Sequence, residues 1–211
     1  MAGADAGVGS RSCSTNTLNP SVKDTLNEIA RCVVCSASLP NRPRPVLAAS
    51  AVSKVVIIGQ APGQKVHESG VPWQDQSGDT LRSWLGVGRE SFYDTANFAL
   101  VPMGFCYPGP GRSGDLPPRP ECAPLWHERL LAGMKHVQLI ILIGQYSQAR
   151  YLGTNAGATL TETVRRGAEY LPRFLPLPHP SPRNRIWLRR NPWFETEVIP
   201  TLRARVAQIL L

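Results

Sequence analysis

The stretch Lys54–Gly63, KVVIIGQAPG, joins a short apolar run to an abrupt turn. Its first half is rich in β-branched residues over a length typical of a buried strand. Its second half holds two glycines and a proline, which fix a tight turn and let the backbone approach a ligand closely. The stretch therefore predicts a strand that ends in a sharp turn, although GQAPG alone is also compatible with an ordinary connection.

The rest of the chain repeats this alternation of strands and helices. Strands are predicted over residues 98–103, 137–143 and 170–177, and helices over 77–86, 123–134, 146–152 and 192–211. Pro102 indicates that residues 98–103 form an edge strand or reach a strand end. The alternation indicates an α/β fold of three layers, α/β/α, with a central four-stranded parallel sheet. The loops GQAPG, MGFCYPG and HPSPRN all follow strands, so we expect one site at the carboxyl ends of the sheet.

Composition is typical of a globular protein. The chain has 211 residues, of which 42% are hydrophobic, and no apolar run reaches the roughly 18 residues of a membrane helix. Residues 1–20 contain no apolar core of a signal peptide and predict a disordered arm, with a single domain over residues 21–211 and a cytoplasmic location. The formal net charge of +8 suits a polyanionic partner such as nucleic acid, or reflects a merely basic surface.

Cysteines form a distinctive pattern. Cys32 and Cys35 are two residues apart, Cys106 and Cys122 follow further along the chain, and Cys13 in the predicted arm is read as incidental. A disulfide framework is not expected in a cytosolic chain. Taken alone, the Cys32–Cys35 pair is compatible with a redox pair, half of a metal site, or chance.

Four blocks occur together in a fixed order: Gly59–Gly63 (GQAPG), Gly70–Trp73 (GVPW), Asp75–Gly78 (DQSG) and, near the end, HPSP from His179. Their order and spacing resemble those of the uracil-DNA glycosylase superfamily from about Arg31 to the C-terminus. The resemblance implies a monomeric DNA-repair enzyme that hydrolyses the N-glycosidic bond of uracil in DNA and leaves an abasic site.

Within that superfamily, family four carries a [4Fe–4S] cluster on four cysteines. The resemblance assigns the cluster to Cys32, Cys35, Cys106 and Cys122, because an Fe–S cube needs one thiolate for each iron. Zinc on the same four sulfurs is the less favoured alternative.

The resemblance also assigns a base pocket. A base must leave the duplex to be cut and is then stacked on an aromatic ring; Trp73 stands where relatives keep a stacking Phe, with a core tryptophan as the alternative. His179 matches a histidine that hydrogen-bonds the uracil carbonyl. Main-chain N–H groups of the GQAPG turn (Gly59, Gln60, Ala61 and Gly63), together with the Gln60 side chain, are expected at the other edge of the base.

The catalytic carboxylate is predicted from a different motif. The long-known enzymes have an Asp at the third position of the first motif, where this chain has Ala61. Family five has an Asp in a D-A-S-G block, which Asp75 matches, so we predict Asp75 as the carboxylate that orients water and favours the cationic sugar. The alternatives are that Asp75 only caps a helix or lies on the surface, or that Glu68 takes the role.

One expected specificity residue is missing. Many relatives place an Asn after the second strand, and the matching position here is about Pro102, while Asn97 lies on the wrong side of the strand. Main-chain groups of Met103 or Gly104 are predicted to substitute. Because this Asn is missing, an alternative function is the removal of another deaminated base such as hypoxanthine.

The segment after HPSP is rich in arginine. A proline-bracketed basic loop suits insertion into a duplex and phosphate contacts, with a solvated basic loop as the alternative. The predicted DNA-binding residues are Ser181, Arg183, Asn184, Arg185, Arg189 and Arg190. A further alternative is a DNA-binding protein that traps uracil with little turnover. The covalent branch of the superfamily uses a histidine in an Arg-rich insertion, and none lies between His136 and His179.

Overall fold

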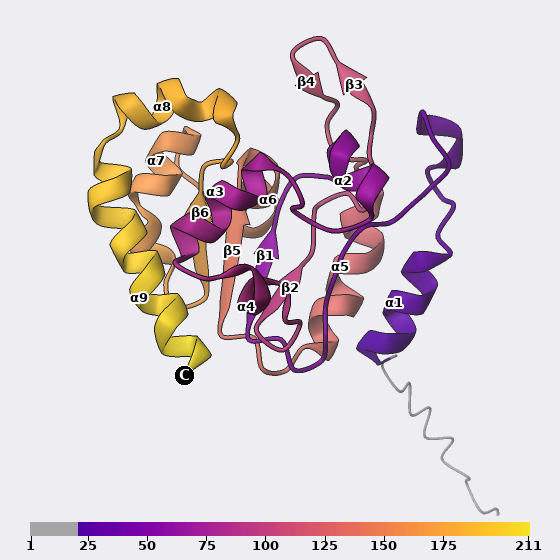
Figure 1. Cartoon of the computed structure of the whole chain (residues 1–211), viewed down its shortest axis with the longest axis horizontal. Coiled ribbons are helices and arrows are strands. Elements are labelled where there is room, and N and C mark those ends of the chain that lie inside the picture. Colours follow the sequence, from indigo (N-terminus) through magenta and orange to yellow (C-terminus); the bar gives the residue numbers. More distant parts are fainter. Residues whose placement is uncertain (1–20) are drawn as a thin grey trace, which may run out of the picture.

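A parallel sheet of four strands forms the centre of the structure, which is a computed structural model describing residues 21–211 (Figure 1). The predicted arm over residues 1–20, with Cys13, lies outside the described residues. The spatial order is β2–β1–β5–β6 with every neighbouring pair parallel. The strands are β1 (Val55–Ile58), β2 (Phe98–Leu100), β5 (Leu139–Ile143) and β6 (Phe174–Leu177). This confirms the predicted α/β fold, and β2 is an edge strand as Pro102 indicated.

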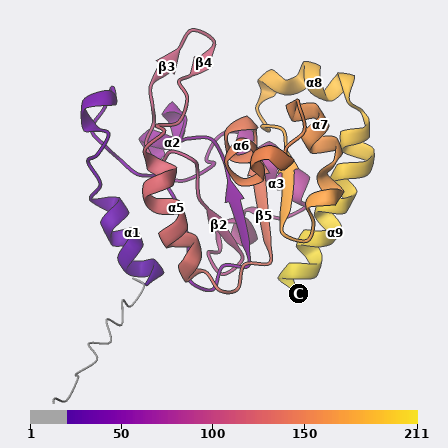
Figure 2. The same ribbon diagram turned by 180° about the vertical axis from the view of Figure 1, so that it is seen from behind.

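Both faces of the sheet are apolar because the central strands are hydrophobic at every position. Val55 and Ile57 of β1 point into one core, whereas Val56 and Ile58 point into the other. The helices that cover the first core are α3 (Gln76–Leu85), α4 (Arg89–Tyr93), α7 (Leu160–Arg165) and α9 (Ile199–Leu210). The second core is covered by α1 (Val22–Ala30), α5 (Cys122–Gly133) and α6 (Gln145–Leu152). Figures 1 and 2 show the two helical layers on opposite sides of the sheet.

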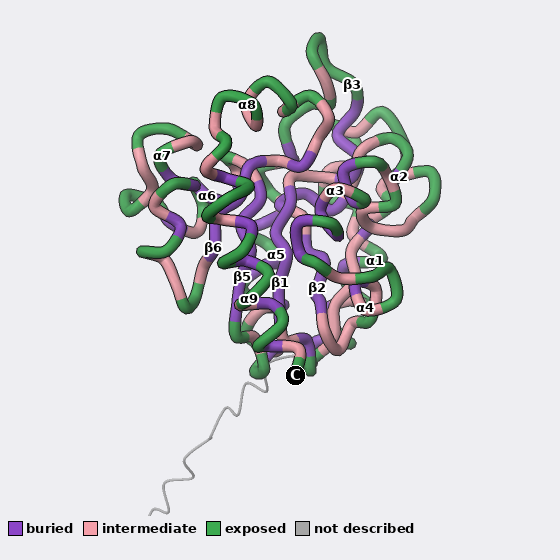
Figure 3. The backbone as a smooth tube through the Cα atoms, turned by 60° about the vertical axis from the view of Figure 1, so that its left-hand side comes forward, coloured by how far each residue is buried: buried purple, intermediate pink, exposed green. Residues whose placement is uncertain are grey.

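Several short elements that the sequence did not predict gather at the carboxyl ends of the strands. They are α2 (Gln64–Ser69), the antiparallel hairpin of β3 (Pro110–Gly111) and β4 (Gly114–Asp115), and α8 (Arg185–Arg190). Figure 1 shows the hairpin and α8 rising at the top of the molecule, above the ends of the central strands. In Figure 3 the strands are buried, while α8 and the hairpin tip are exposed.

Several predicted elements differ in extent. The second and third strands are shorter than predicted, at Phe98–Leu100 and Leu139–Ile143. The fourth strand begins at Phe174, because residues Gly167–Tyr170 form a 3-10 turn and residues 171–173 continue as a turn.

The final helix contains a π turn over Phe194–Val198 immediately before Pro200. Proline has no N–H to donate within the helix, and a widened turn accommodates the loss.

A membrane-spanning segment is not found among residues 21–211. None of the helices there combines the length and the apolar character that crossing a bilayer requires.

Candidate functional site

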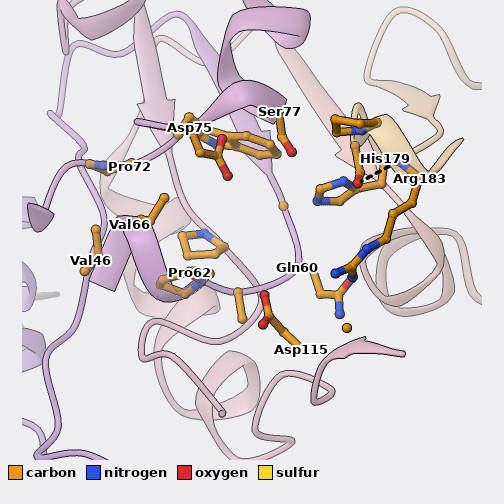
Figure 4. Close-up of a pocket in the computed structure, with 18 of the residues that line it drawn as sticks. Val46, Gln60, Pro62, Val66, Pro72, Asp75, Ser77, Asp115, His179 and Arg183 are labelled. Atoms are coloured by element: carbon orange, nitrogen blue, oxygen red, sulfur yellow. Dashed lines mark hydrogen bonds between the residues drawn. The ribbon is translucent and has the colours of Figure 1, made fainter. Parts of the chain in front are cut away.

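A cavity of about 550 Å³ opens at the carboxyl ends of the strands (Figure 4). It lies between the turn after β1, the segment leading into α3, the loop after β6 and the β3–β4 hairpin. Three of these segments carry the sequence motifs, so the fold brings distant blocks to one place. The predicted site residues that line the cavity are Gly59, Gln60, Ala61, Gly63, Trp73, Asp75, His179, Ser181, Arg183 and Asn184.

The GQAPG turn and Trp73 are packed directly on each other. A Cβ placed on Gly59 would lie 2.7 Å from the indole Cζ2 of Trp73, closer than real Cβ contacts come. Trp73 itself has a φ of 58°, in the left-handed region that side chains rarely adopt. A Cβ on Gly78, in the first turn of α3, would collide with the Trp73 carbonyl oxygen. Two glycines therefore make room for the tryptophan that lines the cavity.

Asp75 has two roles in the geometry. It is the N-cap of α3, and its Oδ1 accepts a hydrogen bond of 2.9 Å from the Gly78 N–H. It is half-buried and also lines the cavity. Asp75 therefore caps the helix and lines the cavity at the same time. Its carboxylate has acceptor positions left for a ligand after it accepts the Gly78 N–H.

His179 faces Trp73 across the cavity. The two ring centroids are 5.8 Å apart and the planes are inclined by 32°. The His179 carbonyl accepts a 2.7 Å hydrogen bond from the Asn184 side-chain amide, which ties the loop after β6 together. Burial lowers the pKa of His179, and the charges of Asp75 and Asp115 oppose that shift only in part. The ring is therefore uncharged at neutral pH and can donate a single N–H.

Met103 and Gly104 do not line the cavity, which corrects the prediction that they read a base. The Met103 N–H donates to the Gly59 carbonyl at 2.9 Å, and the Gly104 N–H donates to the Gln60 carbonyl at 3.0 Å. These bonds hold the loop after β2 against the GQAPG turn. Because each amide has one hydrogen, neither is free for a ligand.

Pro102 also lines the cavity. Its carbonyl oxygen lies 3.0 Å from Nε2 of the buried His127, whose Nδ1 is 2.6 Å from the Tyr151 hydroxyl. Burial lowers the pKa of His127 to about 4. A neutral imidazole with its proton on Nε2 donates to Pro102 and accepts from Tyr151, so the whole chain of bonds points away from the cavity.

The basic residues are divided between two places. Arg183 bends toward the hairpin, and its Nη1 donates to the Ser113 carbonyl at 3.3 Å. Arg185, Arg189 and Arg190 lie on α8 outside the cavity and are exposed. Ile186, also on α8, is an apolar side chain with 56% of its surface exposed. The outer rim thus offers one apolar side chain and three guanidinium groups that have no hydrogen-bond or ion-pair partner among residues 21–211.

Asp115 is a cavity residue that sequence reasoning missed. It ends the β3–β4 hairpin and brings a second carboxylate to the site. The only local signal was the glycine-rich segment YPGPGRSGD, which is compatible with a hairpin but says nothing about where the hairpin folds. Figure 4 shows Asp115 on the side of Gln60 and Pro62, away from Asp75 and Ser77.

The four predicted cysteine ligands line a second, small cavity of about 20 Å³. Cys32 and Cys35 follow α1, Cys106 follows β2, and Cys122 begins α5. Burial, with smaller effects of neighbouring charges, raises the pKa of Cys122 to about 12. Across residues 21–211, no three His, Cys, Asp or Glu side chains are grouped as ligands for a single metal ion. The four thiols border one small space.

A comparison with models of protein families places this architecture among known proteins. Residues 48–203, most of the chain, match the model described as the uracil DNA glycosylase superfamily. The matched range covers all four strands of the sheet and every motif around the larger cavity. The chain therefore belongs to the uracil-DNA glycosylase superfamily.

Proposed function

We propose that this protein hydrolyses the N-glycosidic bond of uracil in DNA and leaves an abasic site. Membership of the superfamily indicates a DNA glycosylase, and uracil as its substrate is the part that we propose. The observation that carries the proposal is the cavity in which an aromatic ring, a neutral histidine, an amide side chain and a carboxylate meet. These are the groups needed to stack, hold and release a base flipped out of DNA.

Trp73 and His179 would bind the flipped base. One face of a pyrimidine stacks on the indole, a contact that gains affinity without reading sequence. The N–H of the neutral His179 donates to a base carbonyl and strengthens as negative charge develops on the leaving base. Gln60 offers both a donor and an acceptor in the same cavity.

Asp75 would stabilise the sugar as the bond breaks. The transition state carries positive charge on the sugar, and a fixed carboxylate lowers its energy more than that of the ground state. The hydrogen bond from the Gly78 N–H keeps this carboxylate oriented. We therefore retain Asp75 as a catalytic carboxylate.

The exposed arginines of α8 would bind the phosphate backbone. Arg185, Arg189 and Arg190 are exposed beside the cavity loop, and guanidinium groups bind phosphate through two parallel hydrogen bonds. Ile186 would press between bases, as apolar side chains do in proteins that unstack DNA. Neither arrangement requires a second subunit, so we propose that the enzyme acts as a monomer.

A [4Fe–4S] cluster would be held by Cys32, Cys35, Cys106 and Cys122. Four thiols that border one cavity match the ligand set of a [4Fe–4S] cluster, in which each iron takes one sulfur, with a single tetrahedral zinc as the alternative. The cluster, when bound, supplies covalent links among α1, the loop after β2 and α5. Purified protein is expected to be yellow-brown with stoichiometric iron and sulfide, whereas a colourless preparation containing zinc would contradict the assignment.

The test of function is a substrate panel. Purified protein is incubated with single- and double-stranded oligonucleotides that contain uracil, hypoxanthine or thymine, and alkali-labile abasic sites are measured. Uracil release by the wild type, with a loss of about a hundredfold in Asp75→Asn, is expected. Wild type that leaves every oligonucleotide intact would refute the proposal, and an equally active Asp75→Asn would refute the assignment of Asp75.

Hypoxanthine is the second candidate substrate. Pro102 lines the cavity without a side-chain amide, and its carbonyl is engaged by His127. The group that reads uracil in many relatives is therefore lacking, which relaxes selection against a larger deaminated base. Faster release of hypoxanthine than of uracil in the same panel would decide for this alternative.

A further inference from the structure

The β3–β4 hairpin carries Asp115 over the GQAPG turn. A Cβ placed on Gly63 would lie 3.2 Å from the Oδ2 of Asp115, so the carboxylate sits directly above that glycine. Tyr107 is buried nearby, and its pKa is raised by burial and then by the charge of Asp115. Asp115 also influences His179 electrostatically. The carboxylate thus acts within the cavity although it comes from a separate loop.

The hairpin is fixed in place at two points. At its base, the Leu116 N–H donates to the Gly109 carbonyl at 2.9 Å. At its tip, Arg183 donates to the Ser113 carbonyl, and a side chain on Gly114 would collide with the Arg183 guanidinium. Gly114 has a φ of 147°, which disfavours other residues. The loop after β6 and the hairpin therefore close around the cavity together.

The two carboxylates of the cavity differ in exposure and in hydrogen bonding. Asp75 is half-buried, and one of its oxygens is occupied by the Gly78 N–H. Asp115 is exposed at the cavity opening, beside the buried Tyr107 hydroxyl, whose pKa is raised by burial and further by the charge of Asp115 and a side-chain hydrogen bond with it. Asp75 and Asp115 lie on opposite sides of the same cavity (Figure 4). A base stacked on Trp73 would leave its sugar between these two sides, where an attacking water could meet Asp115.

We propose that Asp115 is a second catalytic carboxylate that holds and deprotonates the attacking water, a role that rests on the proposed glycosylase function. The C1′–N bond breaks and its electron pair leaves with the base, which His179 stabilises. The water oxygen bonds to C1′, and its proton passes to Asp115. Asp115 returns the proton to solvent, and the released base takes up one proton, so the sum is hydrolysis.

The test compares Asp115→Asn with Asp75→Asn and with Glu195→Gln. Glu195 is an exposed carboxylate on the π turn before α9 and does not line the cavity, so its substitution is the matched control for loss of charge. Base release is measured in a single turnover with enzyme in excess, on whichever substrate the wild type cuts best. DNA affinity is measured separately by fluorescence anisotropy on an oligonucleotide with an uncleavable analogue.

Asp115→Asn is expected to lose about a hundredfold in the single-turnover rate while its DNA affinity stays within about threefold of the wild type. Glu195→Gln should match the wild type in both. Asp115→Asn that cuts within about threefold of the wild type would overturn the inference, as would a loss explained wholly by weaker DNA binding. A wild type that releases no base refutes the proposed function itself, whereas an active wild type matched by Asp115→Asn refutes only the role of Asp115.

Discussion

Gly59→Ala is expected to disable the cavity through one added methyl group. The new Cβ would lie 2.7 Å from the Cζ2 of Trp73, whereas ordinary contact begins at 3.4 Å, so the indole must retreat by at least 0.7 Å or the β1 turn must shift. Gly59 is buried and its carbonyl is bonded to the Met103 N–H, which resists a backbone shift. The ring is therefore the part that moves.

The expected losses of stability and of reaction rate follow from that displacement of the indole ring. Forcing a methyl into a packed site costs about 1–3 kcal/mol of folding free energy, which corresponds to a fall of roughly 2–12 °C in Tm for a chain of this size. Displacement of a positioning ring by nearly 1 Å costs about tenfold to a hundredfold in rate. The loss should appear in the single-turnover rate of base release and in thermal unfolding.

A control variant and a second, compensating substitution test the contact between Gly59 and Trp73. Gly88→Ala is the matched control, because a Cβ there meets nothing within 4 Å. Trp73→Phe removes the outer indole ring that the new methyl meets, so Gly59→Ala combined with Trp73→Phe should lose less than the two single variants together, by about 1 kcal/mol or more. Strictly additive losses, or a Gly59→Ala variant as active and stable as Gly88→Ala, would refute the proposed packing.

Three further outcomes are expected. The pKa of His127 is about 4 in the folded chain, whereas its ordinary value is 6.5. Between these two pH values only the unfolded chain takes up a proton at this residue. The free energy of unfolding should fall by about 3 kcal/mol as the pH drops through this range, and Tm measured from pH 7 to 4 should fall less in His127→Gln. Replacing both Arg189 and Arg190 by Ala should reduce the slope of log affinity against log salt by about 2 on duplex DNA; an unchanged slope would exclude phosphate contacts. Phe194 is fully buried, with its ring centroid 4.9 Å from that of Trp84, and Phe194→Ala should cost about 3–5 kcal/mol in urea unfolding.

The strands and their order of appearance could be predicted because their signal is local. Apolar runs such as VVII and LIILI specify strands buried on both faces, and glycine and proline mark where they end. The motifs around Gly59, Trp73 and His179 could be grouped because parallel strands place their carboxyl ends at one edge. Cys32 and Cys106 are brought to one small cavity in the structure, although their role as cluster ligands remains a proposal.

The shape of the cavity wall could not be predicted in this way. The assignment of Met103 and Gly104 failed because the partner of a backbone N–H depends on how two loops meet, and the sequence of either loop is silent on that. Arg183 was expected at DNA, yet it bonds to the Ser113 carbonyl of a hairpin seventy residues away. Asp115 was overlooked because nothing in its neighbourhood in the chain marks it as a cavity residue.

The sequence by itself therefore determined the α/β fold, the edge of the sheet where the site lies and most of the residues near it. Hydrophobic periodicity and turn chemistry act over a few residues and survive in the linear pattern. Only the tertiary structure decided that Gly63 lies under Asp115 and that Gly59 lies under Trp73. Those contacts arise from close packing between segments far apart in the chain, where an ångström of displacement decides which groups meet.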